Sequence, residues 1–244
     1  MEIRICKDRI ELGKSAAKYV AESINSAIAE KGVARIALST GASQFDTLAA
    51  LIEEDVDWSK VEMFHLDEYV DLPESHVASF RKYLKEKFTT KVTLKAAHFV
   101  EGTEENRKEI CKKISEAPID VGLIGIGENA HIAFNDPPAD FDTEEPYIVV
   151  NLNDTCKQQQ VGEGWFETVN DVPKQAVSMS VKQIMKCKKI ISCVPYSVKA
   201  DAIFKTLSEE ISNQTPATIL KTHKDFTLYI DSDSAAKISI PIVW

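Results

Sequence analysis

Two adjacent carboxylates, Asp67 and Glu68, directly follow the apolar run at residues 61–66. Burying a carboxylate at the end of a strand costs free energy unless the carboxylate is paired with a partner or used in catalysis. Burial also raises its pKa toward that of a general base. Because successive side chains of extended backbone point to opposite faces, we expect only one of the two to face a cleft. The alternative is a solvated loop in which both acids cap a helix.

A second segment whose residues could take part in catalysis reads GIGENAHIAFNDP from residue 125 to residue 137. Its glycines permit a tight turn close to a ligand, but no third glycine completes a dinucleotide-binding fingerprint. His131 can donate and accept protons near neutral pH. Asn129 and Asp136 flank it and could fix its tautomer by hydrogen bonding. The plainer interpretation is a structural histidine with satisfied hydrogen bonds.

A third segment could hold an anion. Between an expected strand ending at residue 38 and a helix beginning near residue 45 lie Thr40, Gly41, Ala42 and Ser43. Such small residues leave N–H groups free at a helix N-terminus, which favours phosphate, although no Gly-Lys-Ser/Thr of a P-loop follows. Lys199, just after another apolar run, could add positive charge. The alternatives are an ordinary capped turn and an exposed lysine.

Short apolar runs alternate with amphipathic stretches along the chain and would position these segments. The runs with the character of buried strands are 35–39, 61–66, 121–126, 189–195 and 226–230. The stretches with helical periodicity are 15–29, 45–54, 79–88, 104–115 and 198–207. This alternation predicts one α/β domain over residues 1–244, a doubly wound, mostly parallel Rossmann-like sheet with helices on both faces. Ligands of such sheets bind at the carboxyl ends of strands, where all three segments lie.

The amino-acid composition limits the kinds of molecule that the protein is expected to bind. The chain has 244 residues, a net charge of -9 and 44% hydrophobic residues, as in a globular protein. The acidic balance argues against nucleic-acid and anionic-membrane partners, which require a cationic face, but not against small phosphorylated ligands.

Metal sites, disulfides and membrane segments are also not expected. The five cysteines are scattered and form no Cys-x-x-Cys motif, so we expect reduced thiols. Neither His65 nor His76 pairs with another histidine at metal-ligand spacing, and we expect no metal or other cofactor. With a polar start and no long apolar span, the chain is expected to be cytoplasmic.

Residues 66–70 (LDEYV) and 125–137 make the chain resemble the glucosamine-6-phosphate deaminase (isomerase) family. This family is related to galactosamine-6-phosphate isomerases and, more distantly, to 6-phosphogluconolactonases. The resemblance runs from about residue 35 to residue 230. The run His-Ile-Ala-Phe-Asn favours the deaminase branch, since lactonases usually read Asp-Gly-His-Thr-Ala-Ser there. The resemblance implies that the protein converts an amino-sugar 6-phosphate, most of all glucosamine 6-phosphate, to fructose 6-phosphate and ammonia without a cofactor.

The resemblance also implies roles for individual residues. Asp67 would move a proton between C2 and C1 of the sugar. His131 would open the pyranose ring, with Asn129 and Asp136 orienting it. Residues 153–166 would lie where the family has a mobile lid. The residues that would hold the 6-phosphate are Thr40, Gly41, Ala42, Ser43 and Lys199.

The chain departs from the family pattern at several positions. Ala130 stands where the family commonly has glycine, Asp136 where it usually has glutamate, and Asn129 where many members have aspartate. Val161 aligns with a lid arginine that often contacts the phosphate. The residues that could substitute for it are Lys157, Gln159 and Gln160.

Three alternatives stay open from the sequence: a galactosamine-6-phosphate isomerase, a 6-phosphogluconolactonase, and a non-catalytic sugar-phosphate sensor. A sensor of the bacterial regulator type would need a helix-turn-helix segment, and only about 35 residues precede the first matched loop. Association into homo-oligomers is possible. The residues that serve the allosteric site of hexameric family members do not occur here, so no allosteric activation is expected.

Overall fold

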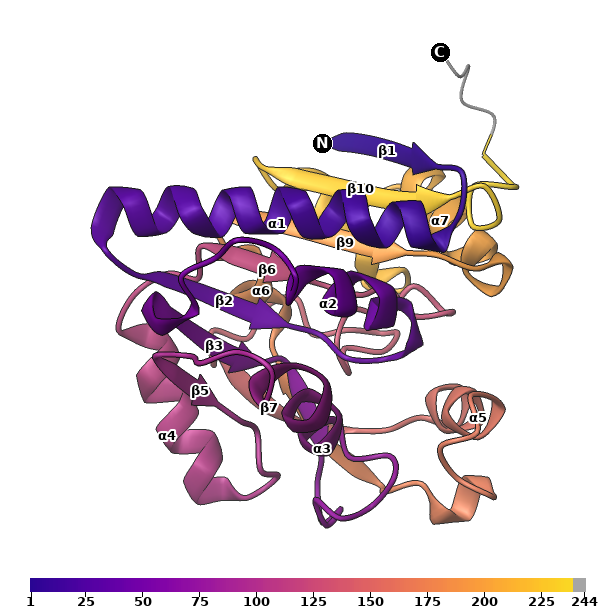
Figure 1. Ribbon diagram of the computed structural model, residues 1–244. Helices are drawn as coiled ribbons and strands as arrows, with labels where there is room; N and C mark the ends of the chain where they lie inside the picture. Colours follow the sequence, from indigo (N-terminus) through magenta and orange to yellow (C-terminus); the bar gives the residue numbers. More distant parts are fainter. Residues whose placement is uncertain (239–244) are drawn as a thin grey trace.

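A seven-stranded sheet forms the centre of the computed structural model, which describes residues 1–238 (Figure 1). Its strand order is β1-β10-β9-β6-β2-β3-β5, and every neighbouring pair is parallel. The strands are β1 (Glu2–Cys6), β2 (Ala34–Leu38), β3 (Val61–His65), β5 (Ala96–His98), β6 (Val121–Leu123), β9 (Lys189–Val194) and β10 (Phe226–Asp231). The predicted mostly parallel sheet is confirmed.

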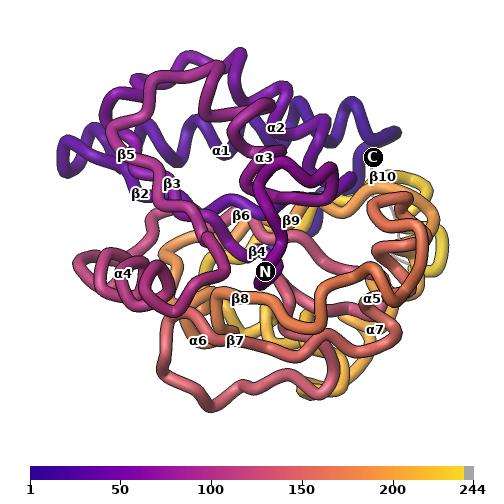
Figure 2. Tube along the Cα trace, turned by 90° about the horizontal axis from the view of Figure 1, so that it is seen from below, coloured from indigo at the N-terminus to yellow at the C-terminus, as the bar shows by residue number. Residues whose placement is uncertain are grey.

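Helices cover both faces of this sheet (Figures 1 and 2). One face packs against α1 (Arg9–Lys31), α2 (Phe45–Leu51) and α3 (Phe80–Leu84), the last continued by a π-helical turn at Lys85–Thr89. The other face packs against α4 (Glu104–Ser115), α6 (Val181–Met185) and α7 (Ala200–Ser208). Within residues 1–238, none of the helices has the length and apolar character needed to cross a membrane.

The longest helix shows how local sequence sets these elements. The expected apolar stripe of α1 is buried, and it includes Ala16, Val20 and Ile24. The helix begins at Arg9, earlier than expected, because the Asp8 side chain accepts hydrogen bonds from the N–H groups of the first turn. It ends at Gly32, whose φ of 80° suits glycine.

A second, antiparallel sheet was not predicted. It has the order β4-β8-β7, with β4 (Asp67–Tyr69), β7 (Tyr147–Asn151) and β8 (Gln175–Met179). Only Leu66 separates β3 from β4. Its N–H donates to Leu38 O at 3.2 Å, and its carbonyl accepts from Met179 N at 2.9 Å. The backbone of Leu66 therefore joins the two sheets, and the acidic pair lies in a buried strand, not in a solvated loop.

The strand order reverses between β2 and β6. From β2 the chain proceeds to β3 on one side, and from β6 it proceeds to β9 on the other. The loops that leave these two strands diverge, which opens a crevice at their carboxyl ends. Ser39, directly after β2, is bonded to the end of β6 and to the loop that follows it. The N–H of Ser39 donates to Leu123 O at 3.0 Å, and its Oγ accepts from Gly125 N at 3.1 Å.

Candidate active site

A cavity of about 150 Å³ opens at the carboxyl ends of β2, β3, β6 and β9. Helix α5 (Asp154–Gly162) contributes part of its wall and lies on the side toward which these strands point (Figure 1). Most of the predicted site residues line it: Thr40, Gly41, Ala42, Ser43, Asp67, His131 and Lys199. Asn129 and Asp136 are not on the wall but contact the ring of His131.

Asp67 faces this cavity with only 6% of its surface exposed. Burial raises the pKa of its carboxyl to about 8, the nearby Glu68 carboxyl adds to the effect, and the N–H of Phe134 opposes it. A carboxyl with a pKa near neutrality can take up and release a proton within one catalytic cycle.

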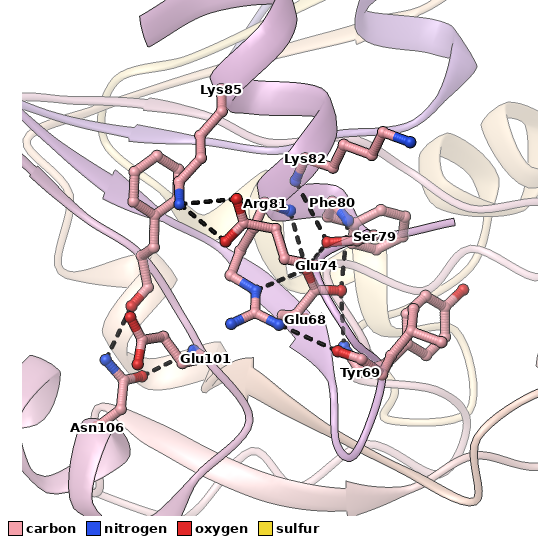
Figure 3. Close-up of polar contacts among 12 residues, drawn as sticks. Glu68, Tyr69, Glu74, Ser79, Phe80, Arg81, Lys82, Lys85, Glu101 and Asn106 are labelled. Carbon is pink, nitrogen blue, oxygen red and sulfur yellow. Dashed lines mark hydrogen bonds and ion pairs between the residues drawn. The ribbon is translucent and has the colours of Figure 1, made fainter. Parts of the chain in front are cut away.

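Glu68 does not line the cavity, and its hydrogen bonds anchor β4 to the start of α3 (Figure 3). Its Oε2 accepts from Ser79 Oγ at 2.9 Å, from the N–H of Arg81 at 2.8 Å and from Arg81 Nε at 3.3 Å. Burial raises the pKa of Glu68, and these donors oppose that rise. The expected alternation of the two acids is therefore observed. Glu68 fixes the strand that presents Asp67, a partnership that sequence reasoning missed.

The ring of His131 is held from one side. Its Nδ1 lies 2.6 Å from Asn129 Oδ1 and 3.1 Å from Asp136 Oδ1. Both neighbours are acceptors, because Asn129 Nδ2 itself donates to Asp136 Oδ1 at 3.0 Å. We therefore assign the proton to Nδ1, which leaves Nε2 as the nitrogen available for a ligand. Burial favours a higher pKa for Asp136, but the hydrogen bonds from His131 and Asn129 outweigh it and hold that pKa below its usual range.

The turn around His131 depends on residues with little or no side chain. A Cβ at Gly127 would lie 2.1 Å from His131 Cε1 and 2.3 Å from Nε2, so the imidazole packs directly on the glycine backbone. Ala130, where the resemblance leads one to expect glycine, has a φ of 63°. This left-handed conformation costs an L-residue with a Cβ about 1–2 kcal/mol. The site therefore contains local backbone strain beside its histidine.

The loop that follows β2 has free hydrogen-bond donors. Neither the N–H of Gly41 nor that of Ala42 has an acceptor within residues 1–238, and the buried Oγ1 of Thr40 also lacks a partner there. Gln44 Nε2 braces the loop by donating to Ser43 Oγ at 2.9 Å and to Cys193 O at 3.0 Å. The loop thus presents several N–H and O–H groups to the cavity, as anion binding requires.

Lys199 also lines the cavity and is 7% exposed, so the alternative of an ordinary exposed lysine is wrong. Burial lowers the pKa of its ammonium, and the carboxylates of Glu163 and Glu128 act in the other direction. A buried cation with few partners is well suited to pair with an anionic ligand.

Gln159 and Gln160 of α5 line the cavity, whereas Lys157 and Val161 do not. Two of the three residues expected to substitute for the lid arginine therefore line the cavity, and their contact with a phosphate stays a prediction. Glu163, just after the helix, also lines the cavity, and its Oε1 accepts from Gln159 Nε2 at 2.7 Å. It lies inside the predicted lid but had no predicted role. Movement of residues 153–166 stays a prediction.

Other wall residues also had no predicted role, among them Glu128 and Tyr196. Glu128 lies inside the segment at 125–137, and Tyr196 follows β9, where the strand-end rule could have identified it.

No group of three or more potential metal ligands occurs in the part of the chain that the structure describes. His65 is fully buried, which lowers its pKa to about 3. His76 stacks on Phe166 at a centroid distance of 5.2 Å.

Comparisons of the sequence with a family model and with curated proteins point to one family. A family model described as glucosamine-6-phosphate isomerases/6-phosphogluconolactonase matches residues 7–229. The chain is 36% identical over 232 residues to a glucosamine-6-phosphate deaminase of Staphylococcus epidermidis, covering 90% of this chain and 94% of the relative. It is 34% identical to that of Clostridium acetobutylicum, covering 96% and 99% respectively.

Solved structures agree with these relatives. A monomeric glucosamine-6-phosphate deaminase superimposes with a TM-score of 0.87 at 28% identity, covering 97% of this chain and 99% of the other. A 6-phosphogluconolactonase from Shewanella baltica has a TM-score of 0.77 at 16% identity, covering 95% and 97%, and so shares the fold. The chain therefore belongs to the family of glucosamine-6-phosphate isomerases and 6-phosphogluconolactonases.

Proposed function

We propose that this protein is a glucosamine-6-phosphate deaminase that converts its substrate and water to fructose 6-phosphate and ammonia. The observation that carries the proposal is the convergence of Asp67, His131 and the donor-rich loop at residues 40–43 on one cavity. An aldose–ketose isomerisation needs a carboxylate that relays a proton, an acid and base at the ring oxygen, and an anchor for the phosphate.

His131 starts the reaction in this proposal. Its free Nε2 accepts the proton of the O1 hydroxyl and delivers a proton to the ring oxygen O5, so the pyranose opens to the aldehyde. During the transfer the ring is briefly an imidazolium, and the ionised Asp136 beside Nδ1 stabilises it. Asn129 accepts from Nδ1 at 2.6 Å and keeps the ring in one orientation.

Asp67 then performs the isomerisation. Its carboxylate removes the proton from C2 and returns it to C1. One proton of the substrate's ammonium group is transferred to O1, which leaves an iminium at C2 and a hydroxymethyl group at C1. Water adds to C2, the C–N bond breaks, and ammonia leaves with fructose 6-phosphate as the second product. The steps are proton transfers and a hydrolysis, so they require no electron acceptor.

The phosphate holds the sugar in place for these steps. In the proposal it accepts from the N–H groups of Gly41 and Ala42 and from Thr40 Oγ1, while Lys199 supplies charge. Binding energy from this remote group can contribute to the ~7–11 kcal/mol available from correct positioning.

A coupled assay tests the proposal directly. Purified protein is given glucosamine 6-phosphate, and ammonia and fructose 6-phosphate are measured separately. The proposal requires both products in equal amounts. A panel with galactosamine 6-phosphate and 6-phosphogluconolactone distinguishes the related activities, and preferred turnover of either compound would contradict the proposed substrate.

We further propose that the protein acts in the cytoplasm. The charged sugar phosphates that it would convert do not cross membranes unaided, and all five cysteines are free in the structure. A reducing compartment keeps such thiols free.

A further inference from the structure

A second and larger cavity, of about 660 Å³, lies between α2 and the segment formed by α3 and its π-helical turn. It shares Gly41 and Phe80 with the candidate active site, so the two cavities are neighbours. No step of the proposed reaction uses it.

Aromatic and aliphatic side chains form much of its lining. The rings of Phe45 and Tyr83 stack with centroids 4.8 Å apart and an interplanar angle of 21°. Ile52, Trp165 and Val77 add apolar surface, and Val77 is 62% exposed. Such a lining favours a flat apolar group, because ring faces offer large contact areas at little conformational cost.

The charged residues of this cavity are mainly cationic. Lys82, Lys87 and Lys91 line it together with two acids, Asp46 and Glu86. Asp46 is already paired with Arg9 at 2.5 Å. Neither Lys87 nor Lys91 forms an ion pair with a carboxylate in residues 1–238. In a chain with a net charge of -9, this is a local cationic site beside an aromatic one.

We propose that this cavity binds a small planar anion, an aromatic or heteroaromatic ring that carries a phosphate, sulfonate or carboxylate group. The ring would contact the Phe45–Tyr83 pair, and the anionic group would lie near Lys87 and Lys91. The cavity is also connected to the active site. Trp165 Nε1 donates at 3.0 Å to Glu163 Oε2, and Glu163 lines the first cavity.

The test uses 8-anilinonaphthalene-1-sulfonate as the probe and the purified full chain without substrate, so its outcome does not depend on the proposed activity. We expect saturable binding of one probe per chain by fluorescence titration. The double variant Lys87→Gln/Lys91→Gln should weaken binding by roughly 3- to 10-fold, as expected for two partly screened charges. The matched control is Lys205→Gln/Lys224→Gln, which removes two exposed lysines elsewhere and should leave binding unchanged.

Two further measurements locate the probe. Ala49→Phe adds a ring to an exposed, cavity-lining position of α2 and should abolish binding, with thermal unfolding used to confirm that the variant folds. The neutral analogue N-phenyl-1-naphthylamine should bind more weakly than the sulfonate. Equal binding by both probes, or equal binding by all variants, would overturn the proposal. So would a dimer that dissociates in Val77→Asp, since the cavity would then be a contact between copies.

Discussion

Replacing Asp67 by asparagine tests the proposed mechanism most directly. The carboxyl has a pKa raised to about 8 by burial and by Glu68, and the substitution removes its charge at nearly constant size. Asparagine cannot accept the C2 proton, so kcat should fall by ~10²–10⁴-fold, the usual contribution of a general base. In the unsubstituted protein only the ionised carboxylate is active. Its kcat/KM should therefore rise about fivefold from pH 7 to pH 8 and level off above pH ~9.

The same carboxyl should also lower stability as the pH rises. Its pKa moves from the model-compound value of 3.8 to about 8 on folding. Between these values the folded protein keeps a proton that the unfolded chain loses, so the free energy of unfolding falls by about 1.4 kcal/mol per pH unit. The loss is complete above pH ~9 and amounts to at most ~6 kcal/mol. Asp67→Asn has no charge to bury, so it should be the more stable protein at pH 8.

Urea unfolding followed by circular dichroism from pH 5 to pH 9 measures this difference, and ammonia release measures kcat. Asp71→Asn is the matched control, because Asp71 is exposed and asparagine accepts its positive φ. The gap in stability between Asp67→Asn and the parent should widen with pH, whereas the control should follow the parent. A variant that keeps more than ~10% of kcat, or that is no more stable at pH 8, would refute the assigned role.

Three other substitutions probe the neighbourhood of the site. Gly127→Ala places a Cβ 2.1 Å from the His131 ring, so kcat should fall ~10²-fold. Gly162→Ala adds a Cβ that meets open space and should change kcat little. An active Gly127→Ala variant would show that the ring position is not critical. Ala130→Gly relieves the positive φ and should raise the free energy of unfolding by up to ~1 kcal/mol in urea, and a loss of stability would argue against strain there. Lys199→Gln should raise KM by ~10-fold or more and change kcat less, whereas an unchanged KM would remove Lys199 from the phosphate site.

The large sheet and the place of the site could be predicted because they depend on strong, local signals. The apolar runs that became β2, β3, β6 and β9 differ clearly from the helices between them. Once those strands are parallel neighbours, their carboxyl ends must meet at one edge. Asp67, His131 and Lys199 each follow one of these strands, so their convergence needed no knowledge of tertiary contacts.

The small sheet could not be found in this way. β4 has only three residues and begins with two acids, and Asp67 pairs with Ser178, far along the chain. Whether so short a segment is a strand is decided by the partner that packs against it, not by its own propensity. The same holds for Glu68, whose partners Ser79 and Arg81 reach it only after the chain has turned into α3. Glu163 faces the cavity because of where α5 sits, which no local pattern encodes.

The pairing of β1 with β10 has a consequence for synthesis on the ribosome. Glu2 lies opposite Thr227, so β1 finds its partner only after β10, the last strand within residues 1–238, has been made. At ~5–20 residues per second, the N-terminal strand waits roughly 10–45 s before its backbone groups can pair. During translation one edge of the nascent sheet is therefore open, and release of a truncated chain that ends before β10 would leave it open permanently.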